Sequence, residues 1–253
     1  MCSSDLQIFE FETVRTWERN PQLYADAIGT SLASQALFAY APEPERARRV
    51  VSKLRQVPRL VQAARDNIKE CPGIFVKIGL ETWRGALKFI EADLPRAFSS
   101  LDDLHILGDL ADTSAEAATA IRSYIGYLET DLAPRAKASF RVGRDNFEQK
   151  LRHEEGITLS AERLLAIALR ELHEVQEEFR SVAGRLNGGD PVAAWREAKA
   201  QHPEPGKLVT AAQGQVQELV EFLQRQGIVT VPHAEPVVVA PSPEFYRWAF
   251  ASM

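Results

Sequence analysis

Apolar residues recur at spacings of three and four along most of this chain, which is the pattern of amphipathic helices. One such series runs from residue 50 to residue 71, and Pro58 interrupts it. Because proline fits the first turn of a helix and not its interior, we expect two helices to meet near Pro58, or one helix to bend there. The apolar members of this series are Val50, Leu54, Val57, Val61, Ala64, Ile68 and Cys71.

Two more series are as regular. One covers residues 76–94, follows Pro72-Gly73 and is expected to close at Pro95. The other covers residues 165–186, with Ser160 as a suitable N-cap. We expect its apolar seam to be buried against other helices. That seam consists of Leu165, Ala168, Leu172, Val175, Phe179, Val182 and Leu186.

Weaker signals complete the pattern, and no alternating strand pairs with hairpin turns occur. The sequence therefore predicts an all-α protein, a bundle of long antiparallel helices with a short extended Pro-rich segment near the C-terminus. No exact internal repeat is visible. The additional predicted elements are a helix opened by Asn20-Pro21, a helix over 115–138 kinked or broken at Pro134, a short helix opened by Asp190-Pro191, a helix over 209–223 ended by Gly227, and extended residues 237–239.

Composition sets limits on the class of protein. The chain has 253 residues, of which 45% are hydrophobic and 26% charged, enough to form a globular core. No apolar stretch approaches the roughly 20 residues of a membrane span, and the start lacks the pattern of a secretory signal. Two cysteines give no disulfide framework. We therefore expect a cytoplasmic protein that does not bind membranes.

A basic stretch lies between residues 46 and 65. The net charge of −5 and the lack of interleaved aromatic residues argue against nucleic-acid binding. We interpret the stretch as the solvated face of a helix, with binding of nucleic acid or anionic lipid as the alternative. Its members are Arg46, Arg48, Arg49, Lys53, Arg55, Arg59 and Arg65.

The segment HEVQE at 173–177 begins like the zinc-peptidase signature HExxH. Glu177 stands where that signature has its second histidine, and the other histidines give no second spaced pair. Two ligands, His173 and Glu177, do not make a zinc site. We interpret the segment as ordinary helix surface, and we expect no metal or other cofactor in this chain.

Both ends of the chain are unusual. Residues 1–6, MCSSDL, are expected to be a non-native or disordered start. The last stretch, PSPEFYRWAFASM, is rich in aromatic residues, whereas chain ends are usually polar. We expect the aromatic tail to need a partner surface, which suggests a longer natural chain.

Several segments, in this order, resemble the bacterial domain-of-unknown-function family 885. The most telling is YLETDLAPRAKASFRVGRDNFEQKLRHEEG at 127–156. The others are FEFETVRTWERNPQLY (9–24), VSKLRQVPRLVQAARDNI (51–68), LETWRGALKFIEADLP (80–95) and PVVVAPSPEFYR (236–247). The resemblance implies a helical zinc peptidase about twice as long, whose metal-binding helix lies downstream of residue 253. It assigns no catalytic residue or metal ligand to this chain.

On this reading, residues 7–253 are one helical region, the N-terminal part of a longer domain, with a possible subdivision near 139–157. Its partners would be the rest of the same protein and, in the full-length form, a peptide substrate and zinc. If any part meets a peptide carboxylate, we expect it to be residues 140–156, because arginine forks pair with carboxylates. Ordinary surface pairing with Asp145, Glu148 and Glu154 is the alternative. The residues in question are Arg141, Arg144, Arg152 and His153.

Two other hypotheses stay open. The chain could be a free-standing helical scaffold that binds another protein, or a small metalloprotein that uses His173 and Glu177. We also expect the isolated chain to expose an apolar patch and to associate with itself.

Overall fold

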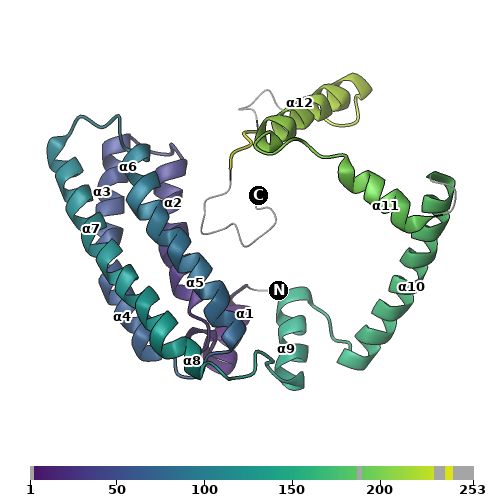
Figure 1. Cartoon of the computed structure of the whole chain (residues 1–253), viewed down its shortest axis with the longest axis horizontal. Helices are drawn as coiled ribbons and strands as arrows, with labels where there is room; N and C mark the ends of the chain where they lie inside the picture. The colour runs from purple at the N-terminus through teal and green to yellow at the C-terminus, as the bar shows by residue number, and fades with distance from the viewer. Residues whose placement is uncertain (1–2, 187–189, 231–236, 242–253) are drawn as a thin grey trace. The chain divides into compact units, whose positions relative to one another are not determined.

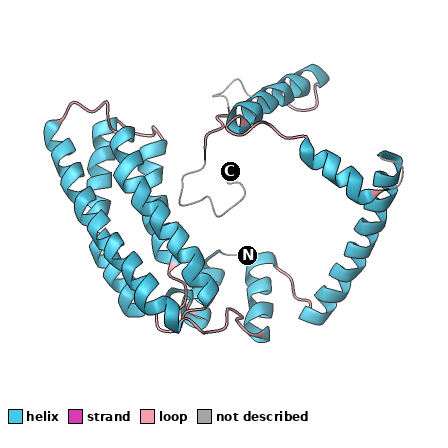
Figure 2. Cartoon of the chain, viewed as in Figure 1, coloured by secondary structure: helices cyan, strands magenta, loops and turns pink. Residues whose placement is uncertain are grey.

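The computed structural model describes residues 3–186, 190–230 and 237–241. These residues form helices, turns and loops, with a single isolated backbone bridge between Pro72 and Lys137, so the predicted all-α class is confirmed (Figure 2). The chain separates into two compact units, the second of which runs from Leu159 to Pro241. This boundary lies just beyond the region 139–157 in which the sequence suggested a subdivision.

The first unit is built on a bundle of long helices that run side by side (Figure 1). Its components are α2 (Gln22–Leu37), α3 (Glu43–Leu54), α4 (Val57–Asn67), α5 (Gly73–Lys88) and α7 (Leu104–Tyr127). α2 packs on α5, and α7 packs along both α3 and α4. The largest fully buried side chains include Trp83, Tyr124, Phe98, Leu32, Leu54 and Ile90.

The predicted break at Pro58 is confirmed. α3 ends at Leu54, α4 begins at Val57, and Pro58 occupies the first turn of α4, where its missing N–H costs nothing. Every apolar member of the 50–71 series is buried, including Cys71 at 2% exposure. The period of three and four therefore continues through the junction, because α3 and α4 cover the same neighbour, α7.

The predicted end at Pro95 is wrong. After α5 the chain passes through a π-helical turn, η3 (Phe89–Asp93), and continues as α6 (Leu94–Ala97). Proline lacks the N–H of an α-helical bond and its ring clashes with the carbonyl four residues earlier. The wider π turn just before Pro95 relieves that conflict, so the helical rod can continue past it.

A π-helical turn also precedes a proline at the end of α7. The helix passes through η4 (Leu128–Leu132) into α8 (Ala133–Arg135), so Pro134 lies in the first turn of α8. The predicted helix over 115–138 also began too late. α7 starts at Leu104, because the carboxylate of Asp103 caps it by accepting from the N–H groups of His105 and Ile106 at 3.1 Å.

α2 and α5 approach each other closely at Gly79. A Cβ atom at Gly79 would lie 2.8 Å from Cγ of Pro21, so no larger residue fits without movement. One turn further along α5, the indole of Trp83 donates to the carbonyl oxygen of Pro21 at 3.0 Å. Asn20 starts α2, as predicted, by accepting from the N–H of Gln22.

Two parts of the first unit were not predicted. At the start of the chain, α1 (Ser3–Phe9) leads through the π-helical η1 (Glu10–Val14) into the short η2 (Thr16–Glu18). α1 therefore begins inside the six residues that were expected to be a non-native or disordered start. The other part is α9 (Arg144–Glu155), which contacts α1 although they are far apart in sequence.

The second unit contains α10 (Ala161–Leu186), α11 (Pro191–Ala200) and α12 (Leu208–Gln226). Ser160 accepts from the N–H of Arg163, so the predicted N-cap is confirmed, and Asp190 caps α11 in the same way. Gly227 ends α12 with φ of 62°, a conformation that favours glycine. The segment 237–239 is not helical, and the side-chain amide of Gln213 binds its backbone at Val237 and Val239.

The prediction that the seam of α10 is buried is wrong. Leu165, Leu172 and Val175 are 58%, 50% and 59% exposed, and Ala183 is the buried side chain among the described residues of this unit. α11 packs on α10 through an edge-to-face contact between Phe179 and Trp195, with ring centroids 6.4 Å apart. The rest of the seam is exposed because the described unit supplies no other helix to cover it.

Two predictions lie outside the described residues: the stop of α10 at Asn187-Gly188-Gly189 and the aromatic tail from Phe245 onward. Among the helices that the structure does describe, none has the length and apolar content of a membrane span.

Candidate functional site

His173 and Glu177 of the HEVQE segment lie on exposed surface of α10, whereas Val175 belongs to its apolar seam. His173 is exposed, Glu174 lies 3.8 Å from Arg170, and Glu177 pairs with Arg180. The described residues contain no group of three or more His, Cys, Asp or Glu side chains that could hold a metal ion.

The basic stretch is mainly a solvated face. Arg48, Arg49 and Arg55 pair with acidic side chains of the same unit, and Arg55 reaches Asp109 at 3.2 Å. Arg46 is the exception, and its assignment to the solvated face is wrong.

Arg46 is 8% exposed. Its guanidinium donates to the carbonyl oxygens of Gln35 at 2.7 Å and Ala41 at 3.0 Å, and it lies over the ring of Phe98. The last turn of α2 and the loop after it present carbonyl groups with no helical partner, and a buried arginine satisfies them.

The basic residues of 140–156 do not converge on one point. Arg144 pairs with Glu148, which is the surface pairing that the sequence offered as an alternative. Arg141 lies over the ring of Phe140, and Arg152 is exposed. His153 packs against Phe9 with ring centroids 5.4 Å apart. Lys150, also on α9, forms an ion pair with Glu10 of η1.

Lys150 meets Glu10 and Thr16 at the junction of α9 with η1. Its Nζ lies 2.6 Å from Oε1 of Glu10, and the hydroxyl of Thr16 donates to Oε2 at 2.5 Å. Glu154 lies further away, at 4.0 Å from Nζ. Both carboxylate oxygens of Glu10 therefore accept a hydrogen bond, from residues 140 positions and 6 positions away.

Around this pair is a cavity of about 180 Å³, here named the η1–α9 crevice. Arg19 forms one side, and its Nη2 donates to the carbonyl oxygen of Ser139. The crevice thus has a charged corner and an apolar wall. Its lining residues are Glu10, Val14, Thr16, Arg19, Phe75, Val142 and Lys150.

A second hollow of about 280 Å³ adjoins the Glu10–Lys150 pair. It shares Glu10, Thr16 and Lys150 with the crevice, and its other walls are apolar or aromatic. Those walls are Leu6, Phe11, Trp17 and Leu23.

The backbone conformation of η1 and Arg15 brings Thr16 close to Glu10. η1 closes with the N–H of Arg15 on the carbonyl of Glu10, and Arg15 has the left-handed φ of 54°. Left-handed backbone at a non-glycine residue costs about 1 to 3 kcal/mol, and π turns and such residues are both frequent at functional sites. The sharp turn brings Thr16 back over Glu10.

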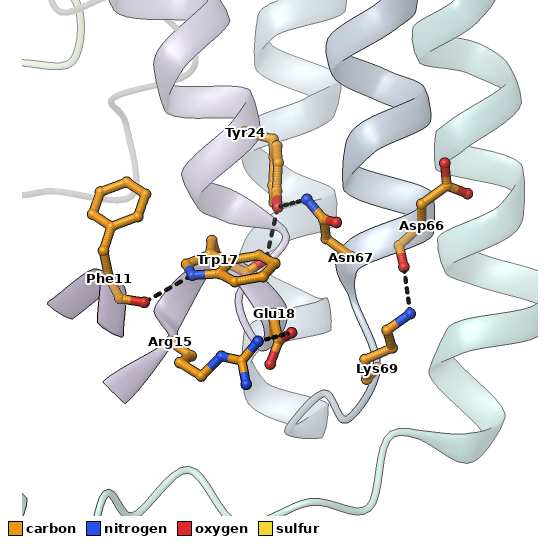
Figure 3. A network of polar contacts seen from close by, with 8 residues as sticks. All are labelled: Phe11, Arg15, Trp17, Glu18, Tyr24, Asp66, Asn67 and Lys69. Atoms are coloured by element: carbon orange, nitrogen blue, oxygen red, sulfur yellow. Dashed lines mark hydrogen bonds and ion pairs between the residues drawn. The ribbon is translucent and has the colours of Figure 1, made fainter. Parts of the chain in front are cut away.

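A polar network holds the turn in place (Figure 3). The indole of Trp17 donates to the carbonyl oxygen of Phe11 at 3.0 Å. Tyr24 donates to the carbonyl oxygen of Trp17 at 2.7 Å, and Asn67 donates to the hydroxyl of Tyr24 at 3.0 Å. The segment that carries Glu10, Thr16 and Arg19 is therefore fastened to α2 and α4.

Electrostatics keep Glu10 ionised. Burial acts to raise the pKa of this carboxyl, but the hydrogen bonds from Lys150 and Thr16, with the charge of Lys150, together lower it below its ordinary value. The crevice therefore presents a fixed carboxylate, Glu10, beside the two cations Lys150 and Arg19.

Sequence reasoning missed all four polar residues of the crevice: Glu10, Thr16, Arg19 and Lys150. Each is an ordinary polar residue with no motif spacing, and Glu10 and Lys150 meet only through the tertiary contact of α1 and α9. The usable signal was that two of the segments which resemble the family, 9–24 and 127–156, contain all four.

Comparison with known proteins places the chain in a family. The model of the family described as "Bacterial protein of unknown function (DUF885)" matches residues 2–253. The chain belongs to the DUF885 family. No protein in the curated set matches it.

A solved structure shares the fold of this DUF885 chain. It is described as that of a putative lipoprotein of unknown function from Shewanella oneidensis, with a TM-score of 0.61 and 24% sequence identity. The match covers 93% of this chain and 46% of the other, so the DUF885 chain spans about half the length of its structural neighbour.

Proposed function

We propose that this chain is the N-terminal helical portion of a zinc-dependent, peptidase-like hydrolase of the DUF885 family, and that it is inactive by itself. In this proposal it forms one wall of a cleft that holds a peptide, and it braces the metal-bearing part. Hydrolysis by a metal-bound water needs a shaped cavity that positions the substrate and excludes solvent.

The observation that supports this function best is the η1–α9 crevice. It combines an apolar wall with two cations and a carboxylate, in a volume that suits one amino-acid residue, and its four polar residues lie in two of the segments that resemble the family, 9–24 and 127–156. The zinc and the hydrolytic step rest on the family resemblance. The match to 46% of a longer chain is consistent with a portion of a larger catalyst.

Metal analysis and peptide hydrolysis test the proposal. The purified chain and the full-length Shewanella oneidensis protein are each assayed for bound zinc and for cleavage of a quenched fluorescent peptide library. We expect stoichiometric zinc and cleavage for the longer protein and neither for this chain. Cleavage by this chain alone, or a longer protein with no zinc and no cleavage, contradicts the proposal.

The exposed seam of α10 favours a second function, that of a helical interaction module. Monomeric proteins rarely expose contiguous apolar patches larger than a few hundred Å². Leu165, Leu172 and Val175, each at least half exposed, follow a seven-residue repeat that suits a partner helix.

The cytoplasmic location expected from the sequence stays a prediction. The description of the structural neighbour as a lipoprotein does not fit it.

A further inference from the structure

We propose that the η1–α9 crevice binds a carboxylate that is attached to a small apolar side chain, the chemistry of a peptide C-terminus or of a free amino acid. This inference deepens the proposed function, because it names the part of a peptide that this portion recognises. It concerns Arg19 and Lys150 as ligand-binding residues and assigns them no role in catalysis.

The first support is donor capacity. A lysine ammonium has three N–H donors and an arginine guanidinium has five. The hydrogen bond of Lys150 goes to Glu10, and that of Arg19 goes to Ser139. Both side chains line the same cavity, so their other donors can converge on one anion.

The second support is charge. Among the lining residues, Arg19 and Lys150 are cationic and Glu10 is anionic, which leaves one positive charge. A single carboxylate balances that charge, whereas a phosphate dianion exceeds it. Glu10 is held by Lys150 and Thr16, so it fixes the position of the ammonium group.

The third support is shape. Val14, Phe75 and Val142 form an apolar wall beside the cations, and the cavity of about 180 Å³ is closer to the size of one residue than to that of a large ligand. Ligand sites typically combine apolar walls with a few placed polar groups. A leucine-like residue would bury its side chain on this wall and place its carboxylate between Lys150 and Arg19.

Binding is tested on the full chain without zinc, with the indole N–H resonance of Trp17 as reporter, because this indole lies on the adjoining hollow. Four probes are titrated: N-acetyl-leucine, leucine, leucinamide and inorganic phosphate. We expect N-acetyl-leucine to bind saturably, and leucinamide, which lacks the carboxylate, not to bind. Leucine that binds more tightly than N-acetyl-leucine assigns the site to free amino acids, and the reverse assigns it to peptide ends.

Variants give the matched comparison. Arg19→Gln and Lys150→Met should each weaken binding of N-acetyl-leucine by about tenfold, because each removes one charge-assisted hydrogen bond. Lys150→Arg should bind within about threefold of the native chain, since it restores a cation. Arg55→Gln, which breaks an exposed ion pair with Asp109 on another face, is the control and should not change binding.

The proposal is overturned if N-acetyl-leucine causes no saturable shift, if leucinamide or phosphate binds as well as N-acetyl-leucine, or if Arg19→Gln and Arg55→Gln behave alike. Because no metal or hydrolysis is involved, a negative result here together with zinc-dependent cleavage by the longer relative would refute this inference and leave the proposed function standing.

Discussion

Arg84 of α5 and Glu129 of η4 form an ion pair at 2.5 Å, and Arg122 of α7 and Glu91 of η3 form its counterpart. Arg122 lies 38 residues after Arg84, and Glu129 lies 38 residues after Glu91. The glutamates begin the similar sequences EADLPRA and ETDLAPRA, and in each of them the end of a π turn is followed by a proline. The two antiparallel rods are therefore related by an approximate internal repeat.

These ion pairs should contribute little to stability. The four side chains are between 39% and 57% exposed, and exposed pairs contribute about 0.2 to 1 kcal/mol. A double-mutant cycle with Arg84→Ala and Glu129→Ala, measured by urea unfolding, should give a coupling energy in that range that falls in 0.5 M salt. The cycle at Arg122 and Glu91 should agree with it, and a coupling above about 2 kcal/mol would contradict the assignment.

Arg46 should behave differently, because it is buried. Arg46→Lys cannot reach both the Gln35 and the Ala41 carbonyl groups with the same fork, so it should reduce the free energy of unfolding by about 1 to 3 kcal/mol. Arg48→Lys is the control, since Arg48 is exposed and lies 3.8 Å from Asp103. Equal effects of the two substitutions would show that Arg46 is not a structural residue.

Gly79 offers a test of the α2–α5 contact. Gly79→Ala forces Pro21 or the helix backbone to move and should destabilise the protein by about 1 to 3 kcal/mol. Gly108→Ala in α7 should instead stabilise it by about 0.5 to 1 kcal/mol, because no atom lies within 4 Å of the new methyl group and alanine favours the helix. Thermal unfolding followed by circular dichroism should show a lower Tm for Gly79→Ala and a higher Tm for Gly108→Ala.

Asp26 should make stability depend on pH. Burial raises the pKa of this carboxyl to about 6, against a partly opposing hydrogen bond from Gln22, and its Oδ1 has no hydrogen-bond partner among the described residues. In the unfolded chain the pKa of this carboxyl is near 3.8, so the folded state holds the proton more tightly. The free energy of unfolding therefore falls as pH rises from about 4 to above 6.

Asp26→Asn removes this charge and should raise Tm by about 2 to 4 °C at pH 7.5, the shift expected for about 1 kcal/mol. At pH 4 or below the variant and the native chain should unfold at the same temperature. Asp112→Asn on the exposed face of α7 is the control, and a benefit of Asp26→Asn that is the same at both pH values would refute the burial argument.

The α10 seam should drive self-association of the isolated chain. Sedimentation velocity should show a concentration-dependent dimer or larger species for the native sequence. Leu172→Lys with Val175→Lys places charges on the seam and should shift the chain to monomer. The control, His173→Lys with Ser181→Lys, adds the same charge on the polar face and should leave the association unchanged. A native chain that is monomeric at all concentrations would contradict the prediction.

The bundle could be predicted from sequence, because its buried positions repeat with the helical period. Every apolar member of the 50–71 series, from Val50 to Cys71, lies in the core for that reason. The same pattern gave a wrong prediction of burial at Leu172 and Val175. Periodicity shows that a helix face is apolar, but it does not show that another helix covers that face. The helix end predicted at Pro95 was wrong because a π turn, which the local sequence does not indicate, allows the helix to continue past the proline.

The crevice could not be predicted from sequence, because its chemistry comes from long-range contact. Glu10 and Lys150 are single charged residues, and neither belongs to a recognisable motif. Their meeting depends on α9 folding back against α1 and on the left-handed turn at Arg15. Arg46 was assigned to the surface for a related reason: its carbonyl partners lie in the last turn of α2 and in the loop after it, and the path of that loop does not follow from sequence.

The buried thiol of Cys71 provides a way to follow the two units separately. Burial raises its pKa to about 12, so the reactive thiolate is scarce while the bundle is closed. Both cysteines of the chain, Cys2 and Cys71, precede Leu159. In a Cys2→Ser background, the rate of alkylation therefore measures transient opening of the bundle alone, and melting of α10 to α12 leaves that signal unchanged.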